Sequence, residues 1–118
     1  ATARAINSSV ALVAMKRAVV ETMEEMGLEK MAVPLAKTTL KMLEELPKTK
    51  DALPLPVLKE KAKCNMAAAA LSLMGERERK RCRQKAEALW REAYAREGKK
   101  EYLELAEECG EKARGKSV

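Results

Sequence analysis

"MAAAALSLMG", residues 66–75, is apolar at every position except Ser72 and ends in glycine. A helix that is apolar on all sides has to be surrounded by other helices. The four consecutive alanines, 67–70, are small enough to let neighbouring helices approach closely. We therefore expect a helix over residues 56–74 in the interior of an all-α fold, with Gly75 as the turn that follows it.

Apolar residues at helical spacing, separated by glycines and prolines, continue along the whole chain, with almost no strand-like alternation. Because 118 residues fit one domain, we predict a single-domain antiparallel bundle over 1–118. The predicted helices are 3–26, 29–46, 56–74, 76–97 and 99–113. A proline-containing connection at 47–56 separates an N-terminal helical hairpin (1–46) from an up-down-up unit of three helices (54–114).

The third and fourth of these helices are expected to pack against each other around the turn at Gly75. Their apolar rows predict a buried contact made of three leucines and three alanines. These residues are Leu71, Leu73, Leu89, Ala69, Ala86 and Ala93.

The sequence offers little that could support catalysis or metal binding. It has no histidine, and Cys64, Cys82 and Cys109 are far apart and form no CxxC pair. We predict no enzyme activity, no cofactor and no metal site, and we interpret the cysteines as small buried residues.

Helical geometry separates the cysteines too far for disulfides, so we expect free thiols and an intracellular, reducing compartment, cytoplasmic or nuclear. The chain has no acidic residue before Glu21, which leaves import into an organelle open. No apolar run is long enough for a membrane span.

The charge is concentrated in one part of the chain. Residues 57–85 hold a charge of +6, which equals the net charge of the whole protein. Within them, "ERERKRCRQK" (76–85) predicts a basic patch for an acidic partner or nucleic acid, although a merely solvated helix end is an equal alternative. The candidate residues are Arg77, Arg79, Lys80, Arg81, Arg83 and Lys85.

The basic patch is expected to project beyond the core with its cations unpaired. Little in the first turns of the fourth helix can be buried, because Cys82 is the single apolar residue of the segment. A stripe of glutamates on the last helix, around Glu108 and Glu111, is expected to reach Lys85 but not Arg77 to Arg81.

The first helix carries more apolar residues than one contact in a small bundle requires. Its methionine-rich rows predict either core lining or a groove for a helical partner, and both interpretations stay open. The candidate residues are Val10, Val13, Met15, Val19, Met23 and Met26.

Together these features favour a non-catalytic interaction or assembly module. It would bind a partner helix, or its own copy, through an apolar helical face. The alternative is a nucleic-acid-binding protein that uses residues 77–85 together with Lys59, Lys61 and Lys63.

Overall fold

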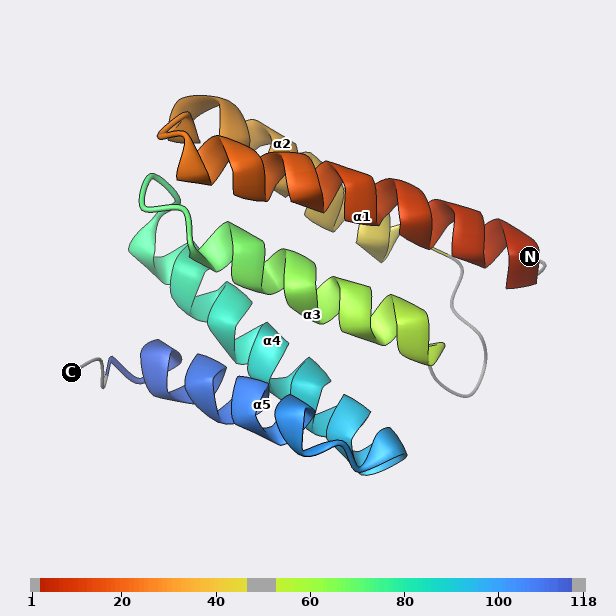
Figure 1. The fold of residues 1–118 in the computed structure, drawn as a ribbon. Coiled ribbons are helices and arrows are strands. Elements are labelled where there is room, and N and C mark those ends of the chain that lie inside the picture. The colour runs from red at the N-terminus through yellow and green to blue at the C-terminus, as the bar shows by residue number, and fades with distance from the viewer. Residues whose placement is uncertain (1–2, 47–52, 116–118) are drawn as a thin grey trace.

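The computed structural model describes residues 3–46 and 53–115, and in these ranges every regular element is an α-helix (Figure 1). The helices are α1 (Ala3–Glu25), α2 (Glu29–Glu44), α3 (Leu55–Ala69), α4 (Glu76–Glu97) and α5 (Lys100–Ala113). The prediction of an all-α bundle of about five helices is confirmed. The part of the predicted connection from 47 to 52 lies outside the described residues.

The α1–α2 hairpin forms because Gly27 ends the first helix. Gly27 has a φ of 76°, in the left-handed region that favours glycine. Its N–H bonds to the carbonyl of Glu24, and the next N–H, of Leu28, bonds to the carbonyl of Met23 at 2.7 Å. This pair of bonds is the Schellman motif, which satisfies the last carbonyls of a helix while it reverses the chain. Pro34 lies inside α2, which begins at Glu29, and its side chain is exposed.

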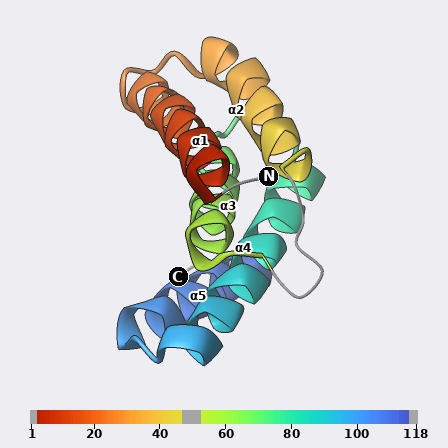
Figure 2. The same ribbon diagram turned by 90° about the vertical axis from the view of Figure 1, so that its right-hand side faces the viewer.

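The third helix is the element on which the others pack. Figure 2 shows α3 between the α1–α2 pair and the α4–α5 pair. Its buried side chains contribute to each of three apolar clusters: with α1, α2 and Cys82, with α4 and α5, and with Val13 and Leu43. The expectation that residues 66–74 are surrounded on all sides is met only in part, because Ala68, Ala69, Leu71 and Met74 are buried whereas Ala70 and Leu73 are exposed.

The α3 helix ends earlier than predicted, at Ala69 instead of residue 74. Residues 70–75 form an irregular turn, in which Leu71 and Met74 are buried but Leu73 is 57% exposed. The prediction that Leu73 is buried is therefore wrong. In a helix its side chain would continue the apolar surface of α3, whereas the turn directs it to solvent.

The contact between α3 and α4 centres on Trp90. The buried row of α4 is Cys82, Ala86, Trp90 and Ala93. Trp90 donates a hydrogen bond from Nε1 to the sulfur of Met66 at 3.1 Å and stacks on Tyr102 of α5, with ring centroids 5.4 Å apart. Leu89, predicted as a core residue, is only half-buried beside this cluster.

Helices α4 and α5 form a close hairpin around Gly98. The φ of Gly98 is 69°, which lies in the left-handed region that favours glycine. At Gly110 the approach is so close that a Cβ would lie 2.3 Å from Glu87 Oε2. The contact of Gly110 with Glu87 also confirms the predicted antiparallel pairing, in which residues near 111 lie opposite residues near 85. None of the helices in the described ranges is long and apolar enough to cross a membrane.

Candidate functional site

The structure divides the predicted apolar face of α1 into two groups. Val13 is fully buried, and Val10 and Met23 are half-buried, so these three belong to the side that packs on the bundle. Met15, Val19 and Met26 are exposed, with Met15 and Met26 each 67% accessible. The core interpretation thus holds for the first group, while the second is free to meet another molecule.

A fourth exposed residue, Leu12, extends the second group, although it is absent from the predicted set. Leu12, Met15, Val19 and Met26 lie on one side of α1, and we call them the α1 seam. They fall into a longer series whose spacing alternates between three and four residues, which is the heptad pattern of helices that pair with other helices. The series is Ala5, Ser8, Leu12, Met15, Val19, Thr22 and Met26.

The polar members of that series do not prevent helix pairing. Ser8 lies near the start of α1 and is exposed. Thr22 donates its hydroxyl hydrogen bond to the carbonyl of Ala18 in its own helix, at 2.9 Å. Its hydroxyl is therefore satisfied within α1, and no unpaired donor would be buried if a second helix covered it.

The apolar surface continues past the end of α1 into a shallow hollow. Leu28, Met31 and Leu73 line it, and all three are exposed. Glu29 holds this corner together by accepting hydrogen bonds from the hydroxyl of Ser72 at 2.9 Å and from the N–H of Leu73 at 3.2 Å. These bonds lower the pKa of Glu29, and they explain why Leu73 lies beside the α1–α2 turn.

The predicted basic patch does not form one surface, because its residues point in different directions from α4. Arg77, Lys80 and Arg83 lie toward α5, whereas Arg81 and Lys85 line a hollow on the side of α2. The expected reach of the α5 glutamates to Lys85 is therefore wrong. Helix geometry explains the division, because residues at i and i+3 or i+4 share a side and neighbouring residues do not.

Arg79 contradicts the prediction that this end of α4 projects with its cations unpaired. Its side chain is 18% exposed, and its Nε donates to the carbonyl of Ala69 at 2.9 Å. Its Nη1 donates a second hydrogen bond to Glu76 Oε1 at 3.0 Å. Because Ala69 is the last residue of α3, Arg79 satisfies one of the carbonyls that a helix end leaves free. Its role in this structure is to anchor α4 to α3.

The cations on the α5 side of α4 meet two more from the end of α5. Lys112 and Arg114 line the same cleft as Arg77, Lys80 and Arg83, together with Glu76, Arg79, Ala113 and Gly115. We call Arg77, Lys80, Arg83, Lys112 and Arg114 the basic cleft. Lys112 is paired with Glu108 at 2.9 Å, and Arg114 lies 3.8 Å from Glu87. Among the residues that the structure describes, the side chains of Arg77, Lys80 and Arg83 have no ion-pair or hydrogen-bond partner.

Of the three lysines of α3 that were predicted to extend the basic patch, Lys61 lines the same hollow as Arg81 and Lys85, whereas Lys59 and Lys63 lie elsewhere. Lys59 lies beside Tyr102 and Glu97, with its Nζ 3.1 Å from the Tyr102 hydroxyl. Lys61 pairs with Glu44 at 3.4 Å and lines the α2-side hollow. Lys63 is exposed. The structure therefore does not form a surface that unites Lys59, Lys61 and Lys63 with residues 77–85.

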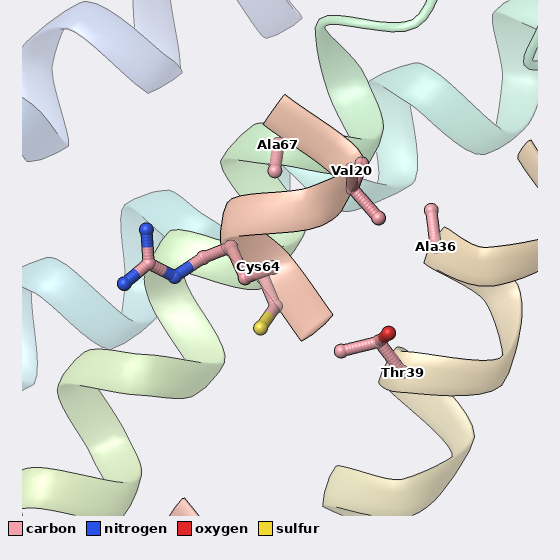
Figure 3. A pocket seen from close by; sticks show the side chains of 6 residues that line it. Val20, Ala36, Thr39, Cys64 and Ala67 are labelled. Atoms are coloured by element: carbon pink, nitrogen blue, oxygen red, sulfur yellow. The ribbon is translucent and has the colours of Figure 1, made fainter. Parts of the chain in front are cut away.

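A buried ion pair connects α1 to α3. Arg17 Nε lies 2.5 Å from Glu60 Oε2, and Glu60 is 5% exposed. Cys64 donates to the same carboxylate at 3.3 Å. Figure 3 shows Cys64, Val20, Ala36 and Thr39 around a cavity of about 10 Å³, which is at the lower limit for one water molecule. This cavity is too small for a substrate. We therefore interpret Arg17, Glu60 and Cys64 as a structural contact that joins α1 to α3.

The three cysteines are free and buried, as their interpretation as small core residues requires. Burial raises the pKa of all three thiols, to about 11 for Cys109. Because the thiolate is the reactive form, these cysteines are held in their unreactive state near neutral pH. Within residues 3–46 and 53–115, no group of three histidine, cysteine or acidic side chains is placed to hold a metal ion.

Two features of these surfaces escaped the sequence analysis. Leu12 belongs to the heptad series, and the alternating spacing of that series was the signal that could have identified it. Lys112 and Arg114 were hidden because residues 99–118 carry no net charge when counted as one segment. Pairing α4 with α5 around Gly98 would have placed these cations opposite the residues near 83.

Comparisons with protein-family models, with curated proteins and with solved structures find no match for this chain.

Proposed function

We propose that this protein is a non-catalytic assembly module that associates with a second copy of itself through the α1 seam. The observation that carries the proposal is the row of exposed Leu12, Met15, Val19 and Met26 on a helix whose opposite side already packs on the bundle. Large apolar side chains gathered on one surface are typical of interaction sites.

The heptad spacing supports a helix as the occupant. Side chains that alternate three and four residues apart stay on one side of a helix and interlock with a second helix that has the same repeat. The residues that flank the seam at Ala11 and Ala18 are small and would allow the two helices to approach closely. The α1 helix itself is a helix with this repeat, so a second copy supplies a matching surface.

The charges of α1 support an antiparallel arrangement of the two copies. The basic residues Arg4 and Lys16 precede the acidic residues Glu21, Glu24 and Glu25, while Arg17 is bound to Glu60 of α3 and does not face the seam. In an antiparallel pair the basic half of one α1 lies beside the acidic half of the other, whereas a parallel pair places like charges together. Complementary charges of this kind orient an interface and suppress the wrong arrangement.

A single substitution in the seam tests this proposal. Val19→Glu places a carboxylate at an exposed position, so the monomer should fold normally, but each dimer would bury two of these charges against apolar side chains. We expect the dissociation constant measured by sedimentation equilibrium to rise at least about tenfold, which corresponds to about 1.4 kcal/mol.

Asn7→Glu is the matched control, because it places a glutamate on an exposed part of the same helix away from the seam. It should leave association unchanged. If Val19→Glu associated as strongly as the unmodified protein, the α1 seam would not be the interface.

A further inference from the structure

We propose that the basic cleft between α4 and α5 binds the phosphate backbone of a nucleic acid. This inference is independent of the α1 seam, which lies on another helix and contains none of the cleft's residues. It also differs from the surface that the sequence indicated, because it leaves out Arg81, Lys85 and the lysines of α3 and includes Lys112 and Arg114.

The first argument is the lack of internal partners for the cations of α4. Arg77, Lys80 and Arg83 follow one another at intervals of three residues, so like charges are neighbours on the helix surface. Such pairs destabilise a helix by roughly 0.2–0.5 kcal/mol each. In the described part of the chain none of the three forms an ion pair, and Glu76 is the one carboxylate among the described lining residues, whereas Arg79, Lys112 and Arg114 each have an acidic partner within 4 Å. A bound anion would remove this repulsion.

The second argument is that the cleft combines cations from two helices at the start of α4. Lys112 and Arg114 come from the end of α5, so the positive potential is directed into a concave surface. Arginine suits phosphate because its planar guanidinium can donate two parallel hydrogen bonds to the phosphate oxygens.

The lining favours a nucleic acid over an acidic protein. Protein interfaces are stabilised mainly by buried aromatic and apolar anchors, and among the described residues that line the cleft only Ala113 is apolar. A nucleic acid needs no such anchors, because its phosphates supply regularly spaced charges. The cleft also has no aromatic residue for stacking on unpaired bases, so we expect it to contact the backbone of a duplex without reading its sequence.

The test uses fluorescence anisotropy with labelled 20-base-pair duplexes of RNA and DNA of the same sequence. If about three phosphates are neutralised, the logarithm of the binding constant should fall with a slope of about −3 against the logarithm of the salt concentration. The two duplexes show whether RNA or DNA is preferred.

The decisive comparison is between two variants that lose the same charge. Arg77→Gln, Lys80→Gln and Arg114→Gln together remove three exposed cations of the cleft. Lys63→Gln, Arg81→Gln and Lys85→Gln together remove three exposed cations outside it. The first variant should bind at least about tenfold more weakly in 0.1 M salt and should reduce the magnitude of the salt slope by two to three. The second should lose far less affinity, and circular dichroism should show both variants folded.

Three results would overturn the proposal. Equal losses in the two variants would show that binding depends on total charge and not on the cleft. Polyglutamate that competed as well as the duplex at equal charge concentration would identify an acidic protein as the ligand. Even non-specific binding normally has a Kd below about 0.1 mM. If the anisotropy of the labelled duplex did not change in low salt at a protein concentration of about 0.1 mM, the cleft would bind no nucleic acid.

Discussion

Side chains of the same residue type have different structural roles in this protein. Arg77 and Arg79 are two residues apart in the same basic run. Arg77 is exposed and forms no ion pair with any described residue, while Arg79 bonds to the carbonyl of Ala69 at the end of α3. The difference arises because Arg79 lies on the side of α4 that faces α3. A run of cations in a sequence therefore has to be assigned residue by residue, since the backbone directs neighbours to different surroundings.

The first prediction concerns this pair of arginines. Arg79→Gln should reduce the free energy of unfolding by about 1.5–3 kcal/mol, the usual range for a hydrogen bond to a charged group. Arg77→Gln should change it by no more than about 0.5 kcal/mol. Urea unfolding followed by circular dichroism measures both. Equal effects of the two substitutions would mean that the bond to Ala69 does not stabilise the turn.

The second prediction concerns pH. Burial, aided by the negative charge of Glu108, raises the pKa of Cys109 from 9.0 to about 11. Between these values the thiol ionises in the unfolded chain but stays protonated in the folded one, so the folded state binds more protons. The thiol's contribution to stability is therefore complete below pH 9 and is lost as pH rises toward 11.

Cys109→Ala should make the fall in stability between pH 9 and pH 11 smaller, by on the order of 2 kcal/mol. Urea unfolding of both proteins across this range measures the difference. Identical pH dependences would show that the Cys109 thiol titrates normally in the folded protein.

At the scale of helices, periodicity and glycines allowed most of the fold to be predicted. The glycines at 27 and 98 have the left-handed φ that ends a helix, and the bounds of α1, α4 and α5 agree with the predicted ones within one residue. The end of α3 could not be predicted, because alanine and leucine at 70 and 71 favour helix. Tertiary bonds from Arg79 and Glu29 stabilise the turn there instead. The burial of Trp90 could not be predicted either, because helical spacing from Cys82 and Ala86 allows Leu89 or Trp90 as the next core residue of α4.

The third prediction concerns the contact between α1 and α3. Glu60→Ala would remove the buried partner of Arg17 and leave it with Glu21 of its own helix at 2.9 Å, so it should reduce the free energy of unfolding by about 1.5–3 kcal/mol. Replacing both residues with methionine removes the uncompensated charge and restores apolar contact, so the double variant should be within about 1 kcal/mol of the unmodified protein. Thermal and urea unfolding measure both. A double variant as unstable as Glu60→Ala would show that the ion pair itself, and not charge burial, determines stability at this contact.

The fourth prediction concerns the orientation of two α1 helices in the proposed dimer. Glu24→Lys with Glu25→Lys would place cations beside the basic half of an antiparallel neighbour, so association should weaken several-fold in low salt and recover in high salt. These exchanges lie near the C-terminal end of α1, where lysine is favourable for the monomer. Sedimentation equilibrium at two salt concentrations measures the effect. Stronger association in low salt would indicate a parallel pair.

For the whole molecule, the proposed surfaces lie on separate parts of the bundle and depend on different forces. Association through the apolar α1 seam should weaken only slightly as salt is raised, because charges contribute mainly to its orientation, whereas the basic cleft should lose its ligand. The sequence indicated both kinds of surface but assigned the residues incompletely. The heptad spacing and the pairing around Gly98 can be read from the sequence, whereas the side of α4 that each cation faces is known only once the helices are placed against one another.

The most direct test of the central claim is the molar mass of the unmodified protein measured by light scattering, at about 0.5 mM, in 0.15 M and in 0.5 M salt. Association through the α1 seam should give twice the chain mass of 13.1 kDa at both salt concentrations. A mass of one chain at both would contradict it.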